Sequence, residues 1–159
     1  MRLITLNGVK LLVYRNGMIL RYSDKVQGDK VKKGWNTLYS WISDKGYRVI
    51  KINQKKYFLH RILAYSFIGL DIENKKQIVD HISRDTLDNR IENLRIVSKQ
   101  ENNWNTNAKG YTRQGGKYTT RIKVNKQIIY LGYFDTEEEA HQAYLDAKAK
   151  YHIIPDTPN

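Results

Sequence analysis

The sequence predicts an α+β protein assembled from small antiparallel sheets and short helices. Three observations predict this class. Asn16-Gly17 lies between two β-prone runs in KLLVYRNGMILRYS, which is a strong hairpin signal. Residues 77–107 are expected to form strand, loop, strand and helix in that order. Residues 117–124 alternate between two faces and precede a helical stripe of Ala and Tyr. A chain of 159 residues suits one ordinary domain or two to three very small ones.

Residues 1–56 are predicted to be a basic, β-rich N-terminal region. A second hairpin is expected in KGYRVIKINQKKYFLH, with its polar turn at residues 53–56. A short helix follows in HRILAYSFIG and is expected to end at Gly69. The expected product is a small antiparallel sheet closed by one helix.

The central region, residues 57–107, contains two further short strands. QIVDHI and LRIVS are β-prone and are joined by a loop rich in Asp, Asn and Arg. Ser98 and Glu101 form a capping box that predicts a helix start.

The C-terminal region, residues 108–159, shows the clearest alternation. In KYTTRIKV, one face carries Tyr118, Thr120, Ile122 and Val124, and the other carries Lys117, Thr119, Arg121 and Lys123. A capping box at Thr136 and Glu139 then predicts a helix whose apolar stripe is Ala140, Ala143, Tyr144, Ala147 and Tyr151. A three-stranded antiparallel sheet packed on one helix is expected, with its cationic face left exposed.

The charge distribution favours a nucleic-acid partner. The net charge is +12 and the sequence pI is near 9.8. Lys and Arg number 13 against 3 Asp and Glu in residues 1–60, 7 against 7 in 61–108, and 8 against 6 in 109–159, so the net values are +10, 0 and +2. The basic charge is therefore concentrated, and not spread evenly over a solvated surface.

Composition also limits the class of metal site and the compartment. The chain has no cysteine, which excludes a disulfide framework and a thiolate zinc site and leaves oxygen and imidazole ligands for a hard ion. The sequence contains neither an apolar run of about 20 residues nor a signal-peptide pattern. An intracellular protein with no membrane partner is expected.

Asp80 and His81 are the residues most suited to chemistry. A carboxylate suits a hard divalent cation, and a neutral imidazole with an ordinary pKa near ~6.5 suits proton abstraction from water. Together they could hydrolyse a phosphodiester. A second oxygen ligand could come from QENNWN, in which the candidates are Asn102, Asn103 and Asn105. The alternative is that the loop residues Asn89 and Asn93 are turn formers and that His81 is an ordinary hydrogen-bonded histidine.

The stretch LHRILAYSFI and the stretch IVDHISRDTLDNRIENLRIVSKQENN resemble the HNH nuclease family, in its phage and intron homing-endonuclease branch with the ββα-metal fold. The likeness covers residues 57–107, with Asn93 twelve positions after His81 and Asn102 nine further on. It implies that His81 is the general base and that Asn93 bonds backbone across the loop to orient it. Asp80 and Asn102 would hold one divalent ion, Mg²⁺ or Mn²⁺.

This region departs from the family pattern at one position. Asn102 stands where many relatives have a second His, although the branch it resembles often has Asn there; Asn103 is the ligand if the helix register differs. His60 and Arg61 also match the family pattern ahead of the motif, and a structural role at a strand-helix junction is expected for them rather than a phosphate contact.

Residues 109–147, and LGYFDTEEEA above all, resemble the plant ethylene-response-factor type of DNA-binding domain, whose sheet enters the major groove. Thr112 and Gln114 stand where plant members have Arg, Arg121 where they have Glu, and Tyr130 where they have Trp. The resemblance implies that the docking mode carries over and the target sequence does not. The expected DNA-binding residues are Thr112, Gln114, Lys117, Thr119, Arg121, Lys123 and Tyr130.

The sequence therefore predicts a metal-dependent HNH DNA endonuclease that hydrolyses phosphodiester bonds in double-stranded DNA. A homing-type, site-specific enzyme that nicks one strand or cleaves both is expected to act as a monomer in the cytoplasm of a bacterial host, if the gene is carried by a phage. One alternative is a sequence-specific DNA-binding regulator with a vestigial nuclease site. Another is an RNA-binding protein, which the narrow major groove of RNA disfavours.

Overall fold

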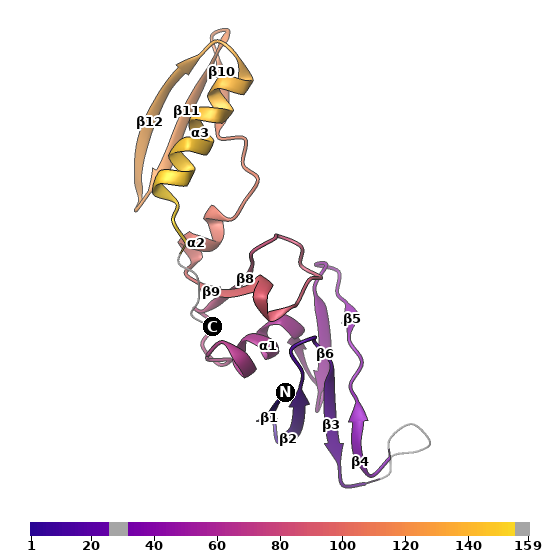
Figure 1. Ribbon diagram of the computed structural model, residues 1–159. Coiled ribbons are helices and arrows are strands. Elements are labelled where there is room, and N and C mark those ends of the chain that lie inside the picture. The colour runs from indigo at the N-terminus through magenta and orange to yellow at the C-terminus, as the bar shows by residue number, and fades with distance from the viewer. Residues whose placement is uncertain (26–31, 155–159) are drawn as a thin grey trace. The chain divides into compact units, whose positions relative to one another are not determined.

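The computed structural model describes residues 1–25 and 32–154, which form two compact units (Figure 1). The first unit comprises Met1–Lys99, and the second begins at Gln100. Several small antiparallel sheets and few helices make up both units, which confirms the predicted α+β class.

The first unit begins with two sheets where the sequence predicted one. The four-stranded sheet has the order β1-β2-β3-β4, and its strands are Arg2–Leu6, Val9–Val13, Ile19–Ser23 and Gly34–Thr37. The three-stranded sheet has the order β5-β6-β7, and its strands are Trp41–Ile42, Arg48–Ile52 and Lys55–Phe58. The sheets are separate because β4 pairs with β3, whereas β5 pairs with β6.

The predicted hairpin turns are present. The turn between β2 and β3 places Gly17 at a φ of +88°, and the side chain of Asn16 accepts a hydrogen bond from the Met18 N–H at 3.1 Å. Between β6 and β7, Asn53 and Gln54 both have positive φ, as a tight two-residue turn requires.

One helix and a hairpin complete the first unit. Helix α1 runs over Leu59–Phe67, strand β8 over Ile78–His81, the 3₁₀ turn η2 over Ile91–Asn93 and strand β9 over Leu94–Val97. Their apolar side chains share one core with the N-terminal strands, formed among others by Leu11, Ile50, Leu63, Ile91 and Leu94. Regions this small bury too little surface alone, so the predicted regions 1–56 and 57–107 meet in a common core. The three functional regions stay predictions.

The second unit is a sheet covered by a helix. After α2 (Lys99–Trp104), strands β10 (Tyr111–Gln114), β11 (Lys117–Val124) and β12 (Gln127–Phe134) form a sheet in that order, and α3 (Glu137–Tyr151) lies along it (Figure 1). The predicted capping box at Thr136 is formed, and Ile122, Tyr144 and Ala147 are the buried centre. Gly110 approaches α3 closely, because a Cβ at this position would overlap the Tyr144 ring.

Within residues 1–25 and 32–154, no helix combines the length and the apolar character that crossing a membrane requires.

Candidate active site

Asp80 lies near the end of β8 and is paired with an arginine that the sequence analysis did not single out. Asp80 and Arg95 are direct cross-strand partners in the β8–β9 hairpin. The Nε and Nη2 groups of Arg95 donate to the same Asp80 oxygen, Oδ2, at 2.9 and 2.8 Å. Both residues are 8 % exposed. The Asp80 carboxylate is therefore part of a buried ion pair with Arg95 in the protein alone.

This pairing limits how Asp80 could hold a metal. Because Arg95 donates twice to Oδ2, a cation would have to share the Asp80 carboxylate with a guanidinium group. One shared carboxylate is a sparse set of protein ligands, and Mg²⁺ accepts such a set because it keeps several waters and uses substrate phosphates as ligands. Across the described parts of the chain, no three His, Cys, Asp or Glu side chains gather as a metal-binding group. The donor set fits magnesium better than an ion that requires an all-protein cage.

His81 is held on two sides. Its Nε2 lies 3.2 Å from Oδ1 of Asn89, in a contact that is buried. Its ring centroid lies 5.0 Å from that of His60 in an edge-on arrangement and 6.1 Å from that of Tyr47. The side chain is 5 % exposed, so its ring orientation is set by packing as well as by the hydrogen bond.

Asn93 ties the ends of the loop between β8 and β9 together. Its Oδ1 accepts from the Ser83 N–H at 2.8 Å, and its Nδ2 donates to the Asp88 carbonyl at 2.7 Å. Its backbone carbonyl accepts from the Ile82 N–H at 2.9 Å. Asn93 thus binds the backbone of the two residues that follow His81 and, through its Nδ2, the backbone of Asp88 later in the loop. The effect of Asn93 on catalysis stays a prediction.

His60 and Arg61, at the start of α1, have structural contacts. Arg61 donates to the Gln77 carbonyl at 2.9 Å. His60 is 7 % exposed, stacks on Phe58 with ring centroids 5.5 Å apart, and its Nδ1 has no partner within the described chain. Burial above all, with smaller effects of His81 and Arg61, lowers the pKa of His60 from 6.5 to about 3. His60 therefore places a neutral ring, and no charge, against His81 at neutral pH.

His60 is expected to make the protein less stable in acid. Between its unfolded pKa of 6.5 and its folded pKa of about 3, the unfolded chain binds a proton that folded His60 does not, so stability falls as the pH falls through this window. By pH 4.5 this effect is about 3 kcal/mol. Urea unfolding at pH 7 and pH 4.5 should show a smaller loss for His60→Phe than for wild type. Equal losses in the two proteins would contradict the assignment.

Asn102, the other predicted metal ligand, lies on α2 beyond the boundary of the first unit and is half-buried, whereas Asn103 on the same helix is exposed. The role of Asn102 as a metal ligand stays a prediction.

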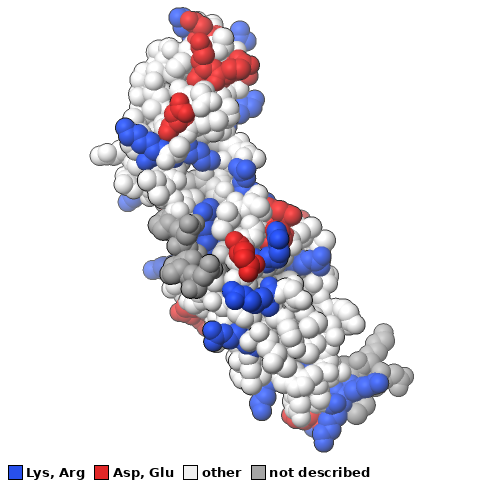
Figure 2. All heavy atoms as spheres, viewed as in Figure 1, with Lys and Arg blue, Asp and Glu red and all other residues white. Residues whose placement is uncertain are grey.

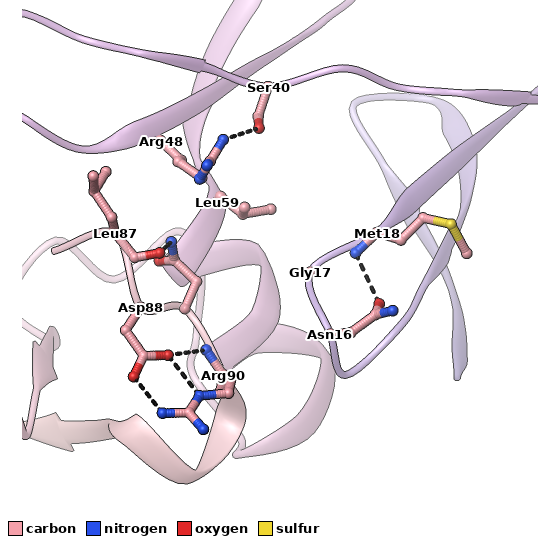
Figure 3. Close-up of a pocket in the computed structure, with 10 residues that line it drawn as sticks. Asn16, Gly17, Met18, Ser40, Arg48, Leu59, Leu87, Asp88 and Arg90 are labelled. Atoms are coloured by element: carbon pink, nitrogen blue, oxygen red, sulfur yellow. Dashed lines mark hydrogen bonds and ion pairs between the residues drawn. The ribbon is translucent and has the colours of Figure 1, made fainter. Parts of the chain in front are cut away.

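A polar pocket of about 400 Å³ adjoins the loop that carries Asn89 (Figure 3). One wall is formed by the loop residues Leu87, Asp88, Asn89 and Arg90, and the rest by Asn16, Gly17, Met18, Ser40, Arg48 and Leu59. Arg90 donates to both carboxylate oxygens of Asp88, at 2.9 and 2.7 Å, which holds the pKa of Asp88 down at about 2. The loop beside His81 is thus braced by local contacts of its own.

In the second unit, the face of the sheet opposite α3 collects the residues expected to bind DNA. Thr120 and Ile122 are buried beneath α3, whereas Arg121 and Lys123 between and beyond them are exposed. Cross-strand pairing places Arg121 beside Tyr130, Thr112 beside Thr119 and Gln114 beside Lys117. The predicted set therefore comes from neighbouring positions on three strands.

Two details of this face were not expected. Tyr133 pairs with Thr119, is 58 % exposed and lies with its ring centroid 5.7 Å from that of Tyr130, so two aromatic side chains are exposed together. Lys117 is paired with Asp135 at 2.9 Å, so its charge is partly compensated. Lys and Arg side chains are visible over both units in Figure 2.

Comparisons with known proteins identify relatives of part of this chain. Residues 57–104 match the family model described as HNH endonuclease. An uncharacterized HNH endonuclease of Acanthamoeba polyphaga mimivirus is 40 % identical over 81 residues, which cover 50 % of this chain and 18 % of that relative. The solved structure of the HNH homing endonuclease I-HmuI, described as showing DNA binding and cleavage, is 26 % identical with a TM-score of 0.49, and the match covers 66 % of this chain and 57 % of that one. The family match supports the HNH resemblance of the segment that contains Asp80, His81 and Asn93.

Proposed function

We propose that this chain, whose residues 57–104 match the HNH endonuclease family, is a metal-dependent DNA endonuclease. One observation carries the proposal. The β8–β9 hairpin places a buried carboxylate and a buried imidazole at consecutive positions, and Asn93 fixes the loop that follows. A fixed carboxylate and a fixed imidazole are what water activation at a phosphodiester requires.

The proposed division of labour assigns His81 to the proton and Asp80 to the metal. His81 takes a proton from the water that attacks phosphorus, and the imidazole acts as the general base. Asp80 would hold a divalent ion, Mg²⁺ or Mn²⁺, and Asn102 is proposed as the second ligand. When bound, the ion supplies polarisation of the phosphate and neutralises charge on the departing oxygen. Asn93 keeps the backbone around His81 in place while these steps occur.

The second unit is proposed to bind double-stranded DNA in the manner of the ethylene-response-factor type. Its exposed face carries Arg121, Lys123 and Tyr130 at adjoining positions, on the side of the sheet away from α3. A reader of this kind lengthens the recognised site, because a small ββα region contacts few base pairs. The proposed enzyme is site-specific and of the homing type. With one active site in a monomer it nicks one strand, and a concerted double-strand break would require a dimer.

Arg121→Ala is expected to raise the Kd for DNA about 10-fold and to lower the salt slope of binding by about one. The reason is that Arg121 is exposed on the proposed binding face beside Tyr130. Fluorescence anisotropy over a salt series measures both values. Lys150→Ala is the matched control, since it removes an exposed positive charge from α3, which covers the other face. An equal loss of DNA affinity in both variants would mean that DNA is bound by the overall positive charge of the protein and not by this face of the sheet.

One observation favours the second candidate, a DNA-binding regulator with a vestigial nuclease site. Arg95 already compensates the charge of Asp80, as an ion pair that no longer holds a metal would also do. Incubation with supercoiled plasmid separates the two functions. The nuclease should convert plasmid to open circle with Mg²⁺ or Mn²⁺ and leave it intact with EDTA. DNA that is bound but uncut across both metals and a broad set of sequences would favour the regulator.

A further inference from the structure

We infer that Asn89 is a positioning residue that holds His81 as the tautomer protonated on Nε2, which assigns Nδ1 as the atom that accepts the proton. The inference rests on the proposed function for its catalytic consequence. Its structural content, the location of one proton, stands independently of cleavage.

The orientation of the Asn89 amide is fixed by a second contact. Its Nδ2 donates to the Leu87 carbonyl at 3.0 Å. If the amide were flipped, its oxygen would face that carbonyl oxygen, and two acceptors would lie together. The backbone N–H of Asn89 bonds the same carbonyl at 3.1 Å. Oδ1 is therefore the atom that faces His81.

This orientation determines which nitrogen of His81 carries the proton. Asn89 Oδ1 has no hydrogen to donate, so at 3.2 Å the Nε2–H of His81 is the donor. A neutral imidazole carries one proton, and with Nε2 protonated the lone pair lies on Nδ1. Burial adds to the preference, because Asn89 is 6 % exposed and His81 is 5 % exposed, and little water can replace the amide.

The surroundings of Asn89 explain how the amide is held. Asp88 and Arg90, on either side of it, bind each other, and Asn93 Nδ2 binds the Asp88 carbonyl at 2.7 Å. In Figure 3 the Asp88 and Arg90 side chains face each other along the loop wall of the pocket. The loop therefore presents Asn89 to His81 from a braced backbone. Local composition alone favours a simpler role for Asn89, as a turn former.

The experiment compares Asn89→Ala with Asn89→Asp, which keeps an acceptor oxygen facing His81 and loses the Nδ2 donor to the Leu87 carbonyl. Asn16→Ala is the matched control, since it removes an amide from the wall of the same pocket, where it bonds the Met18 N–H and not His81. Nitrogen-detected NMR of the metal-free protein locates the ring proton, and the His81→Gln spectrum assigns the signal. Wild type should show a slowly exchanging proton on Nε2. Asn89→Ala should lose this protection, Asn89→Asp should retain part of it because its oxygen still accepts from Nε2–H, and Asn16→Ala should retain all of it.

Kinetics then connect the proton to the reaction. Asn89→Ala is expected to lower kcat for plasmid cleavage about 10- to 100-fold with KM for DNA unchanged, and Asn89→Asp is expected to recover part of the loss. A proton found on Nδ1 in wild type, or equal protection in wild type and Asn89→Ala, would overturn the inference. Because the NMR measurement requires no cleavage, a protein that proves not to be a nuclease would refute the proposed function and leave the assignment of the proton standing.

Discussion

His81→Gln is expected to lower the rate of DNA cleavage by about 10²- to 10⁴-fold while leaving the Kd for DNA within about twofold of wild type. The imidazole is the proposed base, and glutamine cannot accept a proton from water at neutral pH. Glutamine is preferred to alanine here because His81 packs against His60 and Tyr47, and alanine would leave a cavity beside those rings. Single-turnover conversion of supercoiled plasmid to open circle measures the rate.

The control for this variant is another histidine of the same chain. His141 lies on α3 in the second unit, where its Nδ1 contacts the Lys109 carbonyl at 2.8 Å. His141→Gln should cleave at the wild-type rate. If His81→Gln retains wild-type activity and folding, His81 is not the base. If it fails to bind DNA as well as to cleave it, the residue supports the structure of the site and the kinetic argument does not apply.

The sequence predicts those parts of the fold that depend on neighbouring residues. Asn16-Gly17 predicts its hairpin because the turn conformation depends on those residues alone. Thr136 and Glu139 likewise predict the start of α3, because both halves of a capping box lie within one helical turn. Alternation predicts which side chains of β11 face α3, since Thr120 and Ile122 are buried as expected.

Features that depend on distant pairing could not be predicted in the same way. From the sequence, Arg95 is an ordinary polar residue of a strand. Only the hairpin register shows that it lies opposite Asp80. The local sequence predicts that Asn89 is a turn former, and its Nδ2 does bond the Leu87 carbonyl. Nothing in the local sequence indicates that its oxygen also faces His81. The connection between β8 and β9 covers residues 82–93 and is too long to fix the strand register by its length, so no local signal identified either residue. The core that joins the N-terminal strands to α1 depends on contacts between still more distant residues.

Arg95→Met is expected to lower the free energy of unfolding by about 3–5 kcal/mol, because it leaves the Asp80 carboxylate buried without its partner. That loss is a large share of the roughly 5–15 kcal/mol that stabilises an ordinary domain. Urea unfolding with the intrinsic fluorescence of the tryptophans measures it. Met is chosen because it retains much of the apolar stem of Arg and removes the charge. A loss below about 1 kcal/mol would show that the pair is solvated, and not buried as in this structure.

The same ion pair determines how the metal role of Asp80 has to be tested. Asp80→Asn alone leaves Arg95 as a buried, unpaired cation, so lost cleavage could reflect lost stability. The double variant Asp80→Asn, Arg95→Met removes both charges and should be more stable than either single variant, because each single variant leaves one buried charge without its partner and the double variant leaves none. If this stable double variant binds DNA and does not cleave it at any Mg²⁺ concentration, while Arg95→Met still cleaves where it is folded, the carboxylate is required for the reaction. Cleavage by the double variant at the wild-type rate would remove Asp80 from the proposed metal site.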